Sequence, residues 1–207
     1  MKNNFFIVVD GIDGAGKSEI VKKIHNYLFS KNKRFRILTT REPTNGEFGR
    51  KIREIIELEK DPLSNMAKLI DLFIKDRQQH LEKTIEPFLS QANGDEVNIL
   101  ISDRYYYSTI AFQGAQGASI NELIEKNSRF RRPDIAFILD LNPETALKRI
   151  ESRFKEKFEQ LAFMKKIREN FIKLPRLLED NIIIINADKG IEKVFDEIRK
   201  HLDLLTA

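Results

Sequence analysis

The chain has 207 residues, of which 41% are hydrophobic and 33% are charged. This length and composition predict one domain with a packed core, and no apolar run approaches the roughly 20 residues that span a membrane. The net charge of +4 is spread among acids without a basic block, so nucleic-acid binding is not expected. The first residues lack the features of a signal peptide, and the absence of cysteine excludes disulfides and thiolate metal sites. We therefore expect a cytoplasmic protein without nucleic-acid or membrane partners.

Five short apolar runs alternate with segments of helical periodicity along the chain. Each run is rich in β-branched and aromatic residues, which predicts a buried strand. The runs are Phe5–Val9, Phe35–Thr40, Asn98–Asp103, Ile135–Asp140 and Ile182–Ile185. Apolar residues at helical spacing predict helices around Ile20–Leu28, from about Ser64 to Ser90, and from Ile191 onward. This alternation predicts an α/β fold with a five-stranded parallel sheet flanked by helices.

Three of the predicted strands end in an acid: Asp10, Asp103 and Asp140. Ligands of parallel α/β sheets bind at the carboxyl ends of the strands. We therefore expect these three carboxylates on the rim where a ligand would bind.

A glycine-rich turn follows the first predicted strand. Residues Gly11–Ser18 match the pattern G-x-x-x-x-G-K-S, the P-loop, and a chance match between a strand and a helix is improbable. Glycines let backbone N–H groups approach phosphate oxygens, Lys17 can reach the β- and γ-phosphates, and the Ser18 hydroxyl can bind Mg²⁺. The motif predicts a P-loop NTPase-type three-layer fold. The predicted phosphate-binding residues are Gly11, Ile12, Asp13, Gly14, Ala15, Gly16, Lys17 and Ser18.

The pair Asp103-Arg104 narrows the class of P-loop protein. A GTPase would need an Asn-Lys-x-Asp segment, which the sequence lacks, and helicase-like ATPases carry an acidic pair where Arg104 stands. Asp103 can hold Mg²⁺ with Ser18, and Arg104 can place a guanidinium on a phosphate. A cation at this point suits an anionic acceptor better than water. A surface ion pair is the alternative interpretation.

Five ordered segments resemble the thymidylate kinase family, and together they span nearly the whole chain. The central one, Asp103–Gly114, resembles the family pattern D-R-Y-x-x-S-x-x-A-[YF]-Q-G. The other four resemble the P-loop, the R-E-P turn, the F-x-x-x-R helix and the R-P-D…L-D-x-x-P-E…A-L-x-R segment. These four are Gly11–Ser18, Thr40–Pro43, Phe73–Arg77 and Arg132–Arg149.

The resemblance implies roles for individual residues around bound ATP and dTMP. Asp13 would contact the sugar hydroxyl and help to orient Mg²⁺, and Arg41 and Arg104 would hold the acceptor phosphate. Phe73 would stack on thymine and Arg77 would bind its carbonyl edge, although spacing alone favours a core Phe and a solvent-facing Arg. The remaining substrate contacts would be Ser108, Thr109 and Gln113 at the base and Phe112 against a ribose 2′-hydroxyl. Tyr105, Tyr106 and Tyr107 are predicted to be packing residues.

The P-loop itself lacks a basic residue for the transferred phosphoryl group, because its centre is Gly14-Ala15. The resemblance implies a mobile lid around residues 149–158, within a single kinase domain of residues 1–207. Arg153 and then Arg149 are the candidate cations, and a solvated charged helix is the alternative. The catalytic residues would therefore be Asp13, Lys17, Arg104, Arg149 and Arg153.

We thus expect an enzyme that phosphorylates dTMP to dTDP with ATP and Mg²⁺, and the resemblance implies a homodimer. Another P-loop nucleoside or nucleotide kinase, or a non-catalytic nucleotide-binding switch, remains as an alternative. His25, His80 and His201 show no metal-ligand spacing and are predicted to be structural or solvent-facing.

Overall fold

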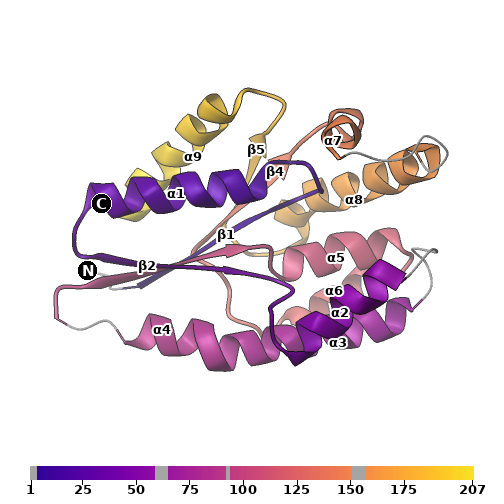
Figure 1. Ribbon diagram of the computed structural model, residues 1–207, viewed down its shortest axis with the longest axis horizontal. Coiled ribbons are helices and arrows are strands. Elements are labelled where there is room, and N and C mark those ends of the chain that lie inside the picture. Colours follow the sequence, from indigo (N-terminus) through magenta and orange to yellow (C-terminus); the bar gives the residue numbers. More distant parts are fainter. Residues whose placement is uncertain (1–3, 59–64, 92–93, 151–156) are drawn as a thin grey trace.

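The computed structural model describes residues 4–58, 65–91, 94–150 and 157–207. Within them, five parallel strands form one sheet in the order β2-β3-β1-β4-β5 (Figure 1). The predicted α/β fold with a five-stranded parallel sheet is therefore confirmed. The strands are β1 Asn4–Gly11, β2 Phe35–Arg41, β3 Val97–Asp103, β4 Ile135–Asp140 and β5 Ile182–Asn186.

Helices cover both faces of the sheet, which gives three layers (Figure 1). On one face lie α1 (Lys17–Lys31) and α9 (Ile191–Leu205). The other helices lie in the longer connections between strands, and several of them cover the opposite face (Figure 1). These are α2 Glu47–Leu58, α3 Met66–His80, α4 Glu86–Ser90, α5 Tyr106–Ala115, α6 Ile120–Asn127, α7 Pro143–Arg149 and α8 Lys157–Leu177.

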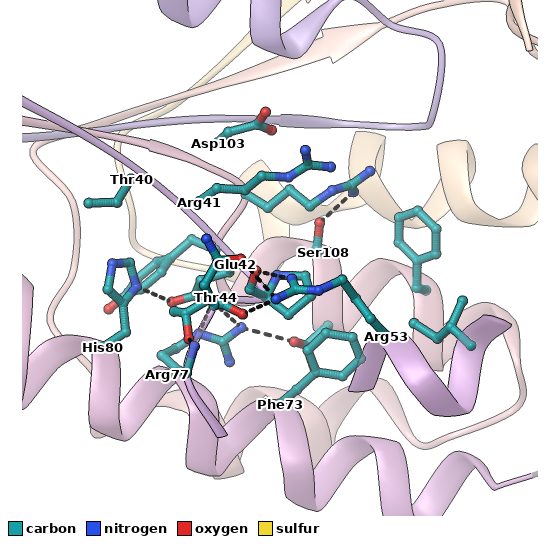
Figure 2. A pocket seen from close by; sticks show the side chains of 18 of the residues that line it. Thr40, Arg41, Glu42, Thr44, Arg53, Phe73, Arg77, His80, Asp103 and Ser108 are labelled. Carbon is teal, nitrogen blue, oxygen red and sulfur yellow. Dashed lines mark hydrogen bonds and ion pairs between the residues drawn. The ribbon is translucent and has the colours of Figure 1, made fainter. Parts of the chain in front are cut away.

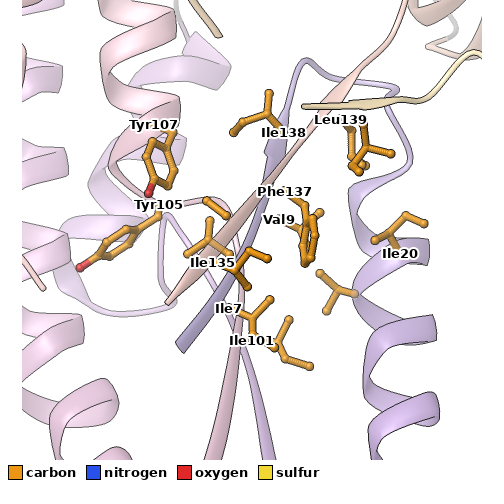
Figure 3. Packing of buried hydrophobic residues seen from close by; sticks show 14 of the residues in the cluster. Ile7, Val9, Ile20, Ile101, Tyr105, Tyr107, Ile135, Phe137, Ile138 and Leu139 are labelled. Atoms are coloured by element: carbon orange, nitrogen blue, oxygen red, sulfur yellow. The ribbon is translucent and has the colours of Figure 1, made fainter. Parts of the chain in front are cut away.

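The core explains why the strands are continuous apolar runs. Every residue of β1 after Asn4 is buried, because helices pack on both faces of this central strand. Figure 3 shows Ile20 of α1 on one side of the sheet and Tyr105 and Tyr107 on the other. All three side chains have an exposed fraction of 0%. Tyr105 and Tyr107 thus pack in the core, and Tyr105 also lines the cavity described below.

The long helix predicted from about Ser64 to Ser90 is a continuous helical segment of three parts. A π-helical stretch, η1 (Leu81–Ile85), joins α3 to α4. The start of the prediction lies outside the described residues. Pro87, which has no backbone N–H to donate, lies just after this π-helical stretch, in the first turn of α4. The π-helical stretch follows His80 directly, and such stretches often occur at functional sites.

The register brings the ends of the three strands at the site to one edge. Val9 of β1 and Arg41 of β2 both pair with Asp103 of β3. The P-loop, the end of β2 and the turn into α5 consequently share one rim of the sheet. Along the described part of the chain, no helix has the length and apolar character needed to cross a membrane.

Candidate active site

The P-loop wraps around the start of α1. Gly11, Gly14 and Gly16 have φ values of 140°, 78° and 91°, in the region that disfavours other residues. A Cβ atom on Gly14 would lie 2.9 Å from the backbone oxygen of Ala146 in α7. The glycines thus permit both the turn and the close approach of α7. The result is a ring of backbone N–H groups at a helix N-terminus, which suits an anion.

Lys17 is buried beneath this loop. Its Nζ donates to the backbone oxygens of Gly11 at 3.1 Å and Ile12 at 2.8 Å, and lies 3.8 Å from Asp13. Burial, together with the charge of Arg104, lowers the pKa of Lys17 to about 8 despite the nearby carboxylates. A triphosphate would favour the charged form, so this lysine is poised to gain from phosphate binding.

Ser18 and Asp103 form the predicted metal pair. The Ser18 hydroxyl donates to Asp103 Oδ2 at 2.9 Å. The other oxygen, Oδ1, is buried and has no hydrogen-bond partner among the described residues. Two hard oxygen donors beside a phosphate loop fit Mg²⁺, which keeps several waters and phosphate oxygens as further ligands. No cluster of three His, Asp or Glu side chains that could hold a metal occurs in the described residues.

Arg104 lies directly after β3 in a left-handed backbone conformation, with φ of 74°. Its backbone N–H donates to Val9 at 2.9 Å, which fixes this turn against β1. Its guanidinium donates to Asp13 and, at 3.0 Å, to Ser108, and its carbon lies 5.4 Å from the ring centre of Phe112. Partial desolvation of Asp13 opposes ionisation, but the charges of Arg104 and Lys17 together lower the pKa of its carboxyl group. Arg104 is therefore held over the P-loop.

The prediction that three strand-end acids line the ligand rim is wrong for two of them. Asp10 is fully buried and accepts hydrogen bonds from Gly11 N at 2.8 Å, Ser108 N at 3.0 Å and Ser108 Oγ at 2.7 Å. Burial raises the pKa of Asp10. Asp140 forms an ion pair with Arg168, whose Nη2 lies 2.9 Å away. Asp10 and Asp140 therefore make contacts within the protein, with the P-loop and α5 and with α8 respectively. Asp103 lines the cavity.

A cavity of about 1280 Å³ opens beside the P-loop (Figure 2). Arg41 lines it, and its charge contributes to the lowered pKa of the Asp13 carboxyl group. The cavity brings together every residue predicted for the acceptor and the metal. These residues are Asp13, Ser18, Arg41, Phe73, Arg77, Asp103, Arg104, Ser108, Thr109, Phe112 and Gln113.

The two lid arginines differ in what the structure describes. Arg149 ends α7, and its Nη1 donates to the backbone oxygen of Gly14 at 3.1 Å, on the P-loop. Arg153, the first candidate for the phosphoryl cation, lies outside the described residues.

Arg77 is not the solvent-facing residue that helical spacing alone favoured. Its exposed fraction is 1%, and its guanidinium is surrounded by acceptors. Thr109 accepts one of its hydrogen bonds, and Ser108 donates to Asp10, so both also orient other side chains. Gln113 is buried, and its Oε1 has no hydrogen-bond partner in the described parts of the chain. The cavity therefore offers Gln113 Oε1 as an acceptor to a ligand.

Several further residues line the cavity and had no role in the sequence analysis, among them Glu42, Arg53, His80 and Phe163. Arg53 donates to the backbone oxygens of Pro43 at 2.8 Å and Thr44 at 2.5 Å. His80, predicted as structural or solvent-facing, is 5% exposed. Glu42 belongs to the R-E-P turn, and this motif was the one sequence feature that could have pointed to Glu42 as a cavity residue. Arg53 lies on a helix with many charged residues, so its sequence context did not single it out.

Comparison with known proteins identifies related sequences over almost the whole chain. A family model described as thymidylate kinase matches residues 9–198. A probable thymidylate kinase of Thermococcus kodakarensis is 36% identical over 202 residues, which cover 93% of this chain and 94% of that protein. The corresponding protein of Methanococcus maripaludis is 39% identical over 204 residues, covering 94% and 93%. That of Archaeoglobus fulgidus is 34% identical over 199 residues, covering 95% and 94%.

Proposed function

Because the chain belongs to the thymidylate kinase family, we propose that it phosphorylates dTMP to dTDP, with ATP as the phosphate donor. The observation that carries this proposal is the shared rim of the P-loop and the cavity. Lys17 and Ser18 lie on one side of that rim, and Arg41 and Arg104 lie on the other. Such an arrangement holds two phosphorylated molecules with their phosphates facing each other.

The donor occupies the P-loop in this proposal. Its β- and γ-phosphates accept from backbone N–H groups at the start of α1 and from Lys17. The Lys17 Nζ exchanges the carbonyls of Gly11 and Ile12 for phosphate oxygens. Arg149 lies close enough to Gly14 to add a second cation at the same phosphates.

The acceptor occupies the cavity. Arg41 and Arg104 bind the phosphate of dTMP, and Asp13 accepts from the sugar hydroxyl. Phe73 stacks on the thymine ring, while Arg77 donates to a ring carbonyl and Gln113 Oε1 accepts from the ring N–H. Phe112 lies beside Arg104, where its ring leaves little room for a ribose 2′-hydroxyl.

The chemical step needs alignment and charge neutralisation more than proton transfer. The attacking atom is a phosphate oxygen of dTMP, which is already ionised near neutral pH. It displaces ADP from the γ-phosphorus, and the γ-phosphoryl group passes to dTMP. Lys17, Arg104 and Arg149 neutralise the charge on the transferred group, and their fixed positions avoid reorganisation during the reaction.

Ser18 and Asp103 would hold Mg²⁺. The ion would supply charge stabilisation at the β- and γ-phosphate oxygens. The buried, unpartnered Asp103 Oδ1 supports this assignment, since a buried carboxylate oxygen without a partner is unfavourable.

Residues 149–158 would form a lid that closes over ATP, within a single kinase domain. Closure would exclude water and limit hydrolysis of ATP. Arg153 would then approach the transferred phosphoryl group from this lid.

The protein would act as a homodimer that pairs through α2 and α3. Ile56 and Leu58 of α2 are 51% and 76% exposed. Ile52, one turn before Ile56, packs against Leu69 and Leu72 of α3. A second copy would bury Leu58, whereas Ile56 also lines the cavity.

A phosphate-transfer panel tests the proposed function. The purified chain is incubated with ATP and Mg²⁺ and with dTMP, dUMP, AMP, CMP, GMP or thymidine in turn, and products are separated chromatographically. We expect dTDP from dTMP as the fastest reaction. The absence of dTDP, or a faster reaction with a purine monophosphate or thymidine, would contradict the proposal. Nucleotide binding without any phosphorylation would indicate a switch instead.

A further inference from the structure

Three ionisable side chains are buried together at one end of the cavity. Glu42, Arg77 and His80 are 3%, 1% and 5% exposed, and all three line the cavity. Glu42 follows β2, whereas Arg77 and His80 lie three residues apart on one face of α3. Figure 2 shows the contacts of Glu42 with both helical residues. The sequence analysis assigned no role to Glu42 or His80.

The two carboxylate oxygens of Glu42 contact different partners, Arg77 and His80. Oε2 accepts from Arg77 Nε at 2.9 Å and lies 2.8 Å from Nη2 of the same guanidinium. Oε1 lies 3.1 Å from His80 Nδ1, and since the carboxylate is an acceptor, the imidazole donates. Rotation of the carboxyl group would break at least one of these contacts. Because a buried charge without partners is costly, the arrangement is strongly constrained.

The same network uses most of the donors of Arg77. A guanidinium has five N–H groups. Nε donates to Glu42, Nη2 donates to Thr109 at 3.0 Å, and Nη1 donates to Asn127 at 2.6 Å. Nη2 also lies 2.8 Å from Glu42 Oε2, as part of the ion pair. The second hydrogen of Nη1 has no acceptor among the described residues, and it is the donor left for a ligand in the cavity. Two aromatic rings lie 5.3 and 5.5 Å from the guanidinium carbon, those of Tyr105 and Phe130.

We propose that Glu42, itself held by His80, is the positioning residue through which the cavity distinguishes one pyrimidine from another. A guanidinium that cannot rotate presents its one remaining donor in a fixed direction. That donor matches the carbonyl at position 4 of thymine and opposes the amino group at position 4 of cytosine. A site that leaves its own buried donor unpaired rejects the wrong ligand strongly. Glu42 therefore favours dTMP over dCMP through its hold on Arg77.

This inference rests on the proposed function, and a small set of variants separates the two. Glu42→Ala removes the carboxylate, and Glu42→Asp keeps the charge but is too short to contact Arg77 and His80 together. Glu42→Gln is the rescue variant: its oxygen still accepts from Arg77, and its amide can donate to His80 in the other tautomer. Glu47→Ala is the matched control, since Glu47 is exposed and pairs with Lys51 at 2.6 Å on α2.

The readout is the ratio of kcat/KM for dTMP to that for dCMP, with KM for ATP measured in parallel. We expect Glu42→Ala and Glu42→Asp to lower this ratio about tenfold or more, and to raise KM for dTMP about tenfold. KM for ATP should stay within about twofold of the wild type. Glu42→Gln should keep the ratio within about threefold of the wild type, and Glu47→Ala should leave it unchanged.

Circular dichroism shows whether each variant is folded. If Glu42→Ala is unfolded, the charge-conserving Glu42→Asp variant tests the inference instead. A folded Glu42→Asp variant with the wild-type ratio would overturn the inference. So would an equal loss of activity toward both monophosphates, which is what a purely structural residue would cause. If the wild-type chain forms no dTDP, the proposed function fails first. If it does and the ratio is insensitive to Glu42, only the inference fails.

Discussion

At the scale of single residues, the burial of Lys17 gives a measurable pH dependence. The pKa of Lys17 is lowered to about 8 by burial, so the side chain is charged below this pH and neutral above it. Triphosphate binding favours the charged form. The affinity for a non-hydrolysable ATP analogue should therefore fall about tenfold between pH 7 and pH 9, measured by titration calorimetry. Lys17→Met should bind more weakly and show a flat profile. A flat profile in the wild type would contradict the lowered pKa.

Arg104 combines a functional guanidinium with an unfavourable backbone conformation, and two substitutions separate these properties. Arg104→Ala and Arg104→Gly should each lower kcat/KM for dTMP about a hundredfold or more, because both remove the cation at the acceptor phosphate. Glycine adopts the φ of 74° without steric cost. Arg104→Gly should therefore exceed Arg104→Ala in free energy of unfolding by about 1 kcal/mol, measured by urea denaturation. Equal stabilities would show that the turn relaxes.

At the scale of elements, the P-loop and α7 are packed backbone against backbone. A Cβ on Gly14 would lie 2.9 Å from the Ala146 oxygen, in a position whose φ is 78°. Gly14→Ala should displace α7 and with it Arg149, and should raise KM for ATP about tenfold or more. Binding of dTMP alone, measured by calorimetry, should change little. Gly94→Ala is the control, because Gly94 also has positive φ but nothing lies within 4 Å of its added Cβ. A similar rise in KM for ATP in Gly94→Ala would show that the effect comes from general destabilisation.

At the scale of the whole molecule, the proposed dimer depends on the exposed apolar residues of α2. Leu58→Glu places a charge in the proposed interface and should shift the protein from dimer to monomer in sedimentation velocity experiments. Leu204→Glu is the control, since Leu204 is 79% exposed on α9 and should leave the dimer intact. A wild-type protein that sediments as a monomer at micromolar concentration would contradict the proposal.

Much of the fold follows from local patterns of residues. The strands read as continuous apolar runs because helices cover both faces of the sheet, and the P-loop is specified by glycines at positions of positive φ. Asp103 and Arg104 could be placed beside this loop because parallel strands end at a common edge. Helices such as α5 and α6 were not resolved individually, since α5 is buried on most sides and lacks a clear amphipathic pattern.

The sequence by itself determined the alternation of strands and helices, the phosphate-binding loop and the family, because each is written in neighbouring residues or in ordered motifs. Only the tertiary structure decided what surrounds the base. Glu42 and Arg77 are separated by 35 positions, and Arg77 and Asn127 by 50. The burial of Arg77 and of Asp10 likewise depends on side chains from distant elements. Burial and hydrogen bonding are properties of such distant pairs, so the folding of β2, α3, α5 and α6 together determines them.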